Sequence, residues 1–162
     1  MAKYYNKRKA LCFFGRIRMI YVSRYANPEL RKGLYTPVRI SIGTPKWPLG
    51  YILAGEIKEL MPFGLKDIGD IEEFKQRYFN RLDRYGVDLI QNRLDCFTQY
   101  GRDVVLLCYE DIRKGPADWC HRTMFAEWWK LRTGELIGEL KDESKFKKAQ
   151  PKESNWVELP LF

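Results

Sequence analysis

The chain has 162 residues, of which 45% are apolar and 31% charged, a length and composition typical of one compact globular domain and not of a disordered chain. Its 29 Lys and Arg residues against 21 Asp and Glu leave a net charge of +8. This excess favours encounters with polyanions such as nucleic acid or a free nucleotide, and it is equally typical of a solvated basic surface.

No segment approaches the roughly 18 consecutive apolar residues of a membrane-spanning helix, and the apolar run 11–14 is too short for a signal-peptide core. We therefore expect a cytoplasmic protein that does not contact a membrane. The cysteines are scattered, with neither the density of a disulfide scaffold nor a CxxC pair, which predicts reduced thiols. They are Cys12, Cys96, Cys108 and Cys120.

The first half of the chain predicts two strands followed by an irregular segment. Residues 17–22 are rich in branched and aromatic side chains, and 38–42 alternate apolar with polar residues, the pattern of a strand. Residues 46–68 contain many Gly and Pro residues, so we expect an irregular excursion with at most one short helix at 55–60.

Helical periodicity and one long apolar run dominate the middle of the chain. Asp70 with Glu73 resembles a capping box, and apolar residues at helical spacing predict a helix from there to about residue 84. A second helix is expected to end near Gly101. The run 103–109 is almost continuously apolar, which indicates a strand buried on both faces.

After a polar loop at 111–118, residues 120–132 predict an amphipathic helix and 136–140 a short final strand. This order predicts an α/β fold: a small Rossmann-like, mostly parallel sheet with helices on both faces. We assign the single domain to 16–140, with a basic N-terminal segment at 1–15 and a charged tail at 141–162.

Ligands of open parallel sheets sit beyond the carboxyl ends of the strands, where helix N-termini also converge. Here the buried strand ends at Cys108 and Glu110, and the next helix starts at Cys120, His121 and Arg122. A helix N-terminus favours a thiolate, so Cys120 is a candidate nucleophile and His121 a candidate general acid or base. Glu110 could hold either neighbour in place, and Cys108 is a further catalytic candidate or a buried small hydrophobe.

Arg122 and Thr123, in the first turn of that helix, are candidates for binding an anion such as phosphate, although Arg122 with Glu110 would also make a structural ion pair. Cys108, Cys120 and His121 offer three ligand types for a metal ion. Because their spacing matches no common zinc pattern, we predict no metal. The chain also lacks the glycine-rich phosphate loops of dinucleotide and triphosphate sites, so we predict no cofactor.

These blocks resemble domain-of-unknown-function family 488, a set of small bacterial, archaeal and viral proteins. The resemblance covers about residues 16–140 and rests on four segments: 20–27 (IYVSRYAN), 40–47 (ISIGTPKW), 104–110 (VVLLCYE) and 120–128 (the Cys-His-Arg block followed by Ala-Glu-Trp). It implies a Rossmann-like sheet with polar residues gathered at the strand ends, which adds Ser23, Asn27 and Lys46 to the anion-binding candidates. It implies no reaction.

The sequence thus favours an enzyme, or an enzyme-like binding domain, for a phosphate-bearing ligand such as a nucleotide or nucleic acid. Two alternatives stay open. One is a non-catalytic nucleic-acid-binding or adaptor protein that uses the basic termini, and the other is a redox sensor in which Cys108 and Cys120 form a disulfide. The apolar segment 156–162 either packs on the domain or docks on a protein partner.

Overall fold

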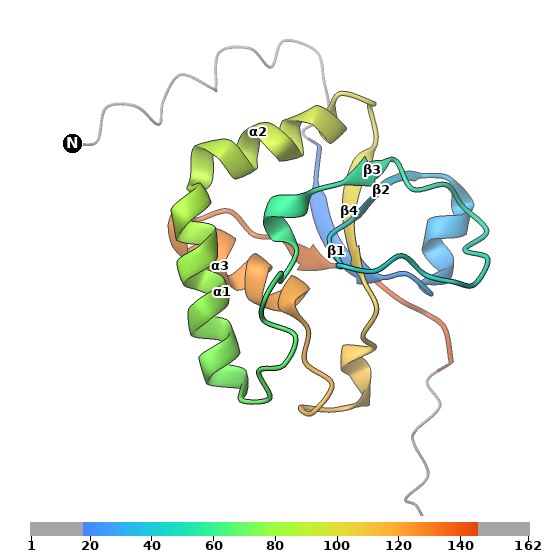
Figure 1. Ribbon diagram of the computed structural model, residues 1–162. Helices are drawn as coiled ribbons and strands as arrows, with labels where there is room; N and C mark the ends of the chain where they lie inside the picture. The colour runs from blue at the N-terminus through green and yellow to red at the C-terminus, as the bar shows by residue number, and fades with distance from the viewer. Residues whose placement is uncertain (1–17, 146–162) are drawn as a thin grey trace, which may run out of the picture.

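The computed structural model describes residues 18–145, which build one five-stranded, all-parallel sheet in the order β3-β2-β4-β1-β5 (Figure 1). This confirms the predicted small α/β fold with a Rossmann-like parallel sheet. The strands are β1 (Ile20–Arg24), β2 (Tyr35–Arg39), β3 (Gly55–Glu56), β4 (Asp103–Cys108) and β5 (Gly138–Glu139).

Strand β4 lies at the centre of the sheet and is fully buried. Leu106 is in register with Val22 of β1 on one side and with Val38 of β2 on the other. Side chains alternate between the two faces of a strand, so Val104 and Leu106 enter one hydrophobic cluster while Val105 and Leu107 enter a second. The continuous apolar run is therefore explained by a strand with a core on each side.

Three α-helices cover one face: α1 (Ile71–Tyr85), α2 (Val87–Thr98) and α3 (His121–Thr133). In Figure 1 they lie together to the left of the sheet. The Asp70 side chain accepts a hydrogen bond from the backbone N–H of Glu73, which caps α1 as the sequence predicts. Trp128 and Trp129 of α3 are almost completely buried in this larger cluster.

The opposite face is covered differently, by the 3₁₀ helix η2 (Pro28–Lys32) and by the long loop between β2 and β3. Leu30 of η2 packs with Tyr25 and with Val105 and Leu107 of β4, and Tyr51 and Leu53 of the loop close the cluster. Both faces are thus covered, but only one of them by α-helices.

Several element boundaries differ from those expected. Strand β2 is Tyr35–Arg39 and not 38–42; it contains Pro37, and Ile42 is exposed beyond its end. The expected short helix at 55–60 is strand β3 followed by the 3₁₀ helix η3 (Lys58–Leu60). The loop after β4 contains a further short 3₁₀ helix, η4 (Ile112–Lys114).

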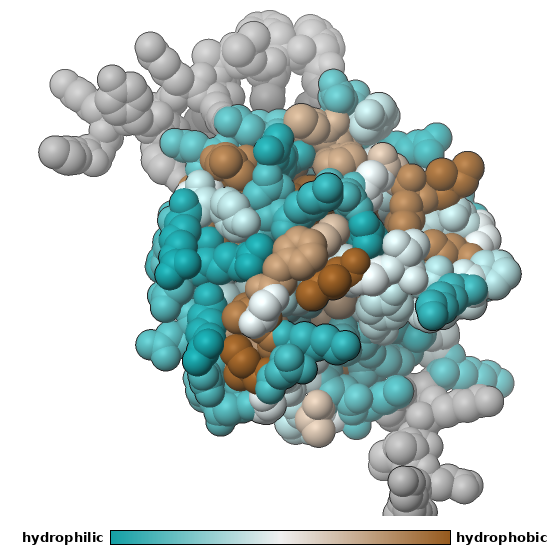
Figure 2. All heavy atoms as spheres, in the orientation of Figure 1, coloured by the Kyte–Doolittle hydropathy of each residue, from teal (hydrophilic) through white to brown (hydrophobic). Residues whose placement is uncertain are grey.

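The described part of the chain has no helix long and apolar enough to span a bilayer. On the face shown in Figure 2, hydrophobic side chains form several small groups among hydrophilic ones. The predicted C-terminal tail begins within the folded part, because Asp142 and Ser144 both bind the Arg24 side chain, at 2.7 and 2.8 Å. The basic segment 1–15 and the apolar segment 156–162 lie outside the described residues.

Candidate functional site

The end of β4 and the start of α3 meet on the helical side of the sheet. Cys108 continues the alternation of Val104 and Leu106, so its side chain points toward α3 and not toward the opposite face. Cys120 is the N-cap residue of α3 and His121 its first helical residue. The alternation of side chains along β4 and the position of the start of α3 together bring two thiols and one imidazole to the same place.

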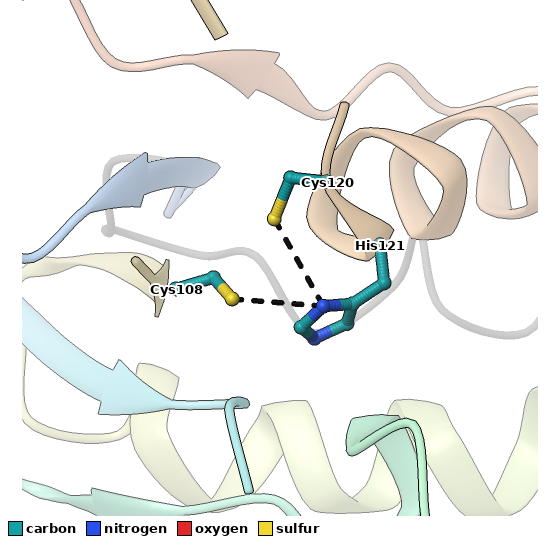
Figure 3. A group of neighbouring side chains, drawn as sticks. All are labelled: Cys108, Cys120 and His121. Atoms are coloured by element: carbon teal, nitrogen blue, oxygen red, sulfur yellow. Dashed lines mark hydrogen bonds between the residues drawn. The ribbon is translucent and has the colours of Figure 1, made fainter. Parts of the chain in front are cut away.

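The three side chains converge on one nitrogen atom (Figure 3). Nδ1 of His121 lies 3.6 Å from the Cys108 sulfur and 3.9 Å from the Cys120 sulfur. All three ligand-type atoms lie within 4.8 Å of one another. The residues are buried, with His121 5% exposed and both cysteines less so. We call Cys108, Cys120 and His121 the thiol–imidazole cluster.

The other imidazole nitrogen fixes the tautomer of His121. Nε2 lies 2.9 Å from the backbone carbonyl oxygen of Ile40, which can only accept a hydrogen bond. Nε2 therefore carries the proton, and in the neutral ring Nδ1 presents a lone pair to the two thiols. Both nitrogens have partners inside the protein, so His121 has no nitrogen left for a proton of a bound ligand.

Glu110 extends the cluster toward solvent. The Cys120 thiol donates to its carboxylate, with 2.8 Å between Sγ and Oε2, so one proton lies between the two groups. Burial raises the pKa of Cys120, but the hydrogen bond that its thiolate accepts from the Cys108 thiol, together with the positive charge of Arg122, outweighs burial and lowers the pKa to about 6. The hydrogen bond with Cys120, together with burial, raises the pKa of Cys108. Cys108 thus keeps its proton when Cys120 loses its own.

A pocket of about 500 Å³ opens onto these residues. Cys108, Glu110, Cys120 and His121 all line it, so the four predicted catalytic candidates share one cavity. The other lining residues come from the turn after β2, from the segment before α1 and α1 itself, from the position after β4 and from the loop before α3: Ser41, Ile42, Gly43, Pro62, Lys66, Phe74, Tyr109, Ala117 and Trp119.

Arg122 does not line this pocket. The helix turns its side chain to the far side of the cluster, where it lines a separate cavity of about 180 Å³. Its Nη1 donates to the backbone oxygen of Glu110 at 2.8 Å, and its Nε and Nη2 donate to the Glu139 carboxylate at 3.0 to 3.3 Å. The guanidinium is 1% exposed. It holds the strand ends together and supports the backbone of Glu110.

The remaining anion-binding candidates also have structural partners or lie elsewhere. Asn27 donates to the Ser23 hydroxyl at 2.9 Å and to the backbone oxygen of Lys141 at 3.2 Å, which ties the chain beyond β5 to β1. The Thr123 hydroxyl donates to the Cys120 carbonyl. Lys46 is exposed and is not among the lining residues of the pocket. The five candidates do not gather at one site.

None of the other lining residues was selected as a site residue from the sequence, and Lys66 and Trp119 show why. Lys66 lies in the irregular segment before α1, where no periodicity predicts which loop residue reaches the site. Trp119 directly precedes Cys120 and packs edge-on against Phe74, with 4.7 Å between the ring centroids. Its position directly before the start of α3 is the sequence signal that could have identified it.

Comparisons with known proteins identify no relative of this chain. No family model matches it, and no curated protein or solved structure is significantly similar to it. The resemblance to domain-of-unknown-function family 488 therefore stays an expectation from four short segments.

Proposed function

We propose that the protein is an enzyme that hydrolyses a small phosphate-bearing ligand, such as a nucleotide, bound in the pocket at the carboxyl ends of β2 and β4. The observation that carries the proposal is the convergence of Cys108, Cys120, His121 and Glu110 at the wall of one 500 Å³ cavity. Convergent polar groups in a cleft of this size are typical of a working site.

In this proposal Glu110 acts first as the general base and then as the general acid. Its carboxylate lines the pocket, whereas both nitrogens of His121 are engaged inside the protein. Glu110 accepts a proton from an attacking water, the water oxygen forms a bond to the electrophilic atom of the ligand, and the bond to the leaving group breaks. Glu110 then returns the proton to the leaving group.

The ligand class follows from the other walls. Lys66 and the start of α3 provide positive charge and backbone N–H groups, which favour phosphate. Phe74, Tyr109 and Trp119 provide aromatic surface, which favours a flat ring. Arg122 is a positioning residue here, because it supports the backbone of Glu110 and does not reach the ligand.

The proposal is tested by measuring both ligand binding and enzymatic turnover. A ligand present at about 100 times its Kd stabilises a protein by about 2.7 kcal/mol, so a thermal-shift screen of nucleotides, nucleosides and inorganic phosphate detects the class. We expect a nucleotide to be the best ligand and Lys66→Ala to weaken its binding, while the exposed Lys46→Ala is the matched control.

Glu110→Gln is expected to keep nucleotide binding and to lose turnover. Turnover is measured by chromatographic separation of the products. Equal effects of Lys66→Ala and Lys46→Ala on binding would contradict the assigned pocket. Unchanged turnover in Glu110→Gln would contradict the assigned chemistry.

A further inference from the structure

Two of the three separations in the thiol–imidazole cluster match those of a metal-ligand set, and the third, between the two sulfurs, lies within 4.8 Å. Zinc binds thiolate sulfur at about 2.3 Å and imidazole nitrogen at about 2.0 to 2.1 Å in a tetrahedron, which places sulfur and nitrogen ligands about 3.6 Å apart. The two sulfur-to-Nδ1 distances are 3.6 and 3.9 Å. The cluster therefore needs shifts of only tenths of an ångström in these two distances to hold the ion.

The surroundings of His121 favour the same interpretation. A metal-binding imidazole almost always donates its other N–H to a carbonyl or carboxylate, which fixes the ring and its tautomer. Nε2 of His121 has this bond, to the buried backbone carbonyl of Ile40, and Nδ1 is left facing both sulfurs. A sequence reading that requires CxxC or HxxxH spacing misses this set, because its ligands come from a strand end and a helix start.

We infer that Cys108, Cys120 and His121 bind one Zn²⁺ ion through both sulfurs and Nδ1, with the fourth ligand position facing the pocket. Thiolate and imidazole ligands in a tetrahedral arrangement select zinc among the common divalent ions. Three protein ligands with an open fourth position are the arrangement of catalytic zinc sites, whereas structural sites have four.

Two neighbours suit this assignment. Binding of the ion requires Cys120 as a thiolate, and Glu110 Oε2 lies 2.8 Å from its sulfur as an acceptor for the proton that leaves. The buried guanidinium of Arg122 donates to the backbone oxygen of Glu110 at 2.8 Å, so it holds in place the residue whose carboxylate accepts that proton. Glu110 lines the same pocket, so it can exchange a proton with a water in the fourth position.

The inference deepens the proposed function, on which the catalytic use of the ion depends, but metal binding rests on the three ligand atoms alone. The first measurement is titration of the metal-free, reduced protein with Co²⁺, which reports its ligands by absorption. We expect one ion per chain, thiolate-to-cobalt charge transfer in the near ultraviolet, intense tetrahedral bands in the visible, and displacement by Zn²⁺.

Single variants assign the ligands. Cys108→Ser, Cys120→Ser and His121→Gln are each expected to weaken Zn²⁺ binding at least about 10-fold in competition with a chromophoric chelator, the lower bound for loss of even a supporting contact. Cys96→Ser is the matched control, because Cys96 is a free, exposed thiol on α2, and it is expected to bind like the unmodified protein.

A variant that fails to fold gives no information on ligands, so alkylation of the unmodified protein provides a second measurement. Zn²⁺ is expected to protect Cys108 and Cys120 from iodoacetamide and to leave Cys96 reactive, as read by peptide mass spectrometry. Absence of thiolate-to-cobalt absorption, or equal alkylation of Cys108 and Cys120 with and without Zn²⁺, overturns the inference.

The two proposals fail separately. Nucleotide binding that persists in metal-free protein, with no Zn²⁺ binding, leaves the pocket assignment standing and removes the metal. Zn²⁺ binding that requires both cysteines, without any effect of Lys66→Ala on nucleotide binding, leaves the metal and removes the proposed ligand.

Discussion

Replacing Arg122 by Met separates the two roles that sequence and structure give to this residue. The sequence places Arg122 on the ligand, where its loss would weaken binding and leave stability nearly unchanged. In the structure its guanidinium is 1% exposed and binds the Glu110 carbonyl and the Glu139 carboxylate. Met fills a similar volume without the charge or the hydrogen bonds, so the variant removes those interactions with little change in packing.

The expected cost follows from the groups left behind. Removing one partner of a buried ion pair costs about 3 to 5 kcal/mol, but the Glu139 side chain is 35% exposed and water replaces part of its lost partner. The Glu110 carbonyl loses a charged donor as well. We expect Arg122→Met to lower the free energy of unfolding by about 2 to 3 kcal/mol, or the melting temperature by roughly 8 °C.

Urea denaturation followed by tryptophan fluorescence and circular dichroism measures this loss. Lys114→Met, on the exposed end of η4, is the control for removing a positive charge and is expected within about 0.5 kcal/mol of the unmodified protein. The loss of unfolding free energy in the double variant Arg122→Met, Glu139→Gln should be smaller than the sum of the losses in the two single variants. A stable Arg122→Met protein that no longer binds nucleotide would refute the structural role and restore the anion-binding role.

Three further predictions concern the frame around the site. Tyr78→Phe removes a buried hydroxyl that donates to the Leu60 carbonyl at 2.7 Å, and is expected to cost about 1 to 3 kcal/mol in urea denaturation. Asp70→Ala removes the N-cap of α1 and should cost about 1 kcal/mol, while Asp70→Asn should cost less. Hydrogen bonds from Arg113 lower the pKa of Asp111 to about 2, so its contribution to stability is present above about pH 4 and is lost as the pH falls toward 2. Carbon-detected NMR titration should give this pKa, and the stability difference from Asp111→Asn should shrink over the same range; a pKa near 4 would contradict it.

The elements with strong local signals could be predicted from the sequence. Helix α1 has a cap and an apolar stripe, and β4 has an uninterrupted apolar run, so both were located closely. The predicted range of β2 was displaced toward the C-terminus. Pro37 argues against a strand locally, whereas the pairing with β4 determines where the strand forms. Local patterns do not include such long-range pairing.

The sequence predicts the parts of the candidate site that depend on the topology of the sheet. It does not predict the parts that depend on the direction of individual side chains. Cys108 and Cys120 meet because strand ends and helix starts converge in a parallel sheet. Arg122 follows His121 by one helical step, which turns its side chain by about 100° onto another face of α3. Lys46 and Lys66 both lie in irregular segments, and no rule of spacing selects the second for the pocket.

The central position of β4 has a consequence for how the chain becomes ordered during its synthesis. Its neighbours β1 and β2 do not pair with each other, and the Met19–Asp103 bond beside the β1–β4 pairing joins residues 84 positions apart. A ribosome needs roughly 4 to 17 s to add that many residues at about 5 to 20 per second. For that time β1 has no strand to pair with, because its partners β4 and β5 are both synthesised later. An apolar strand that waits this long for its partner is exposed to aggregation and accessible to chaperones.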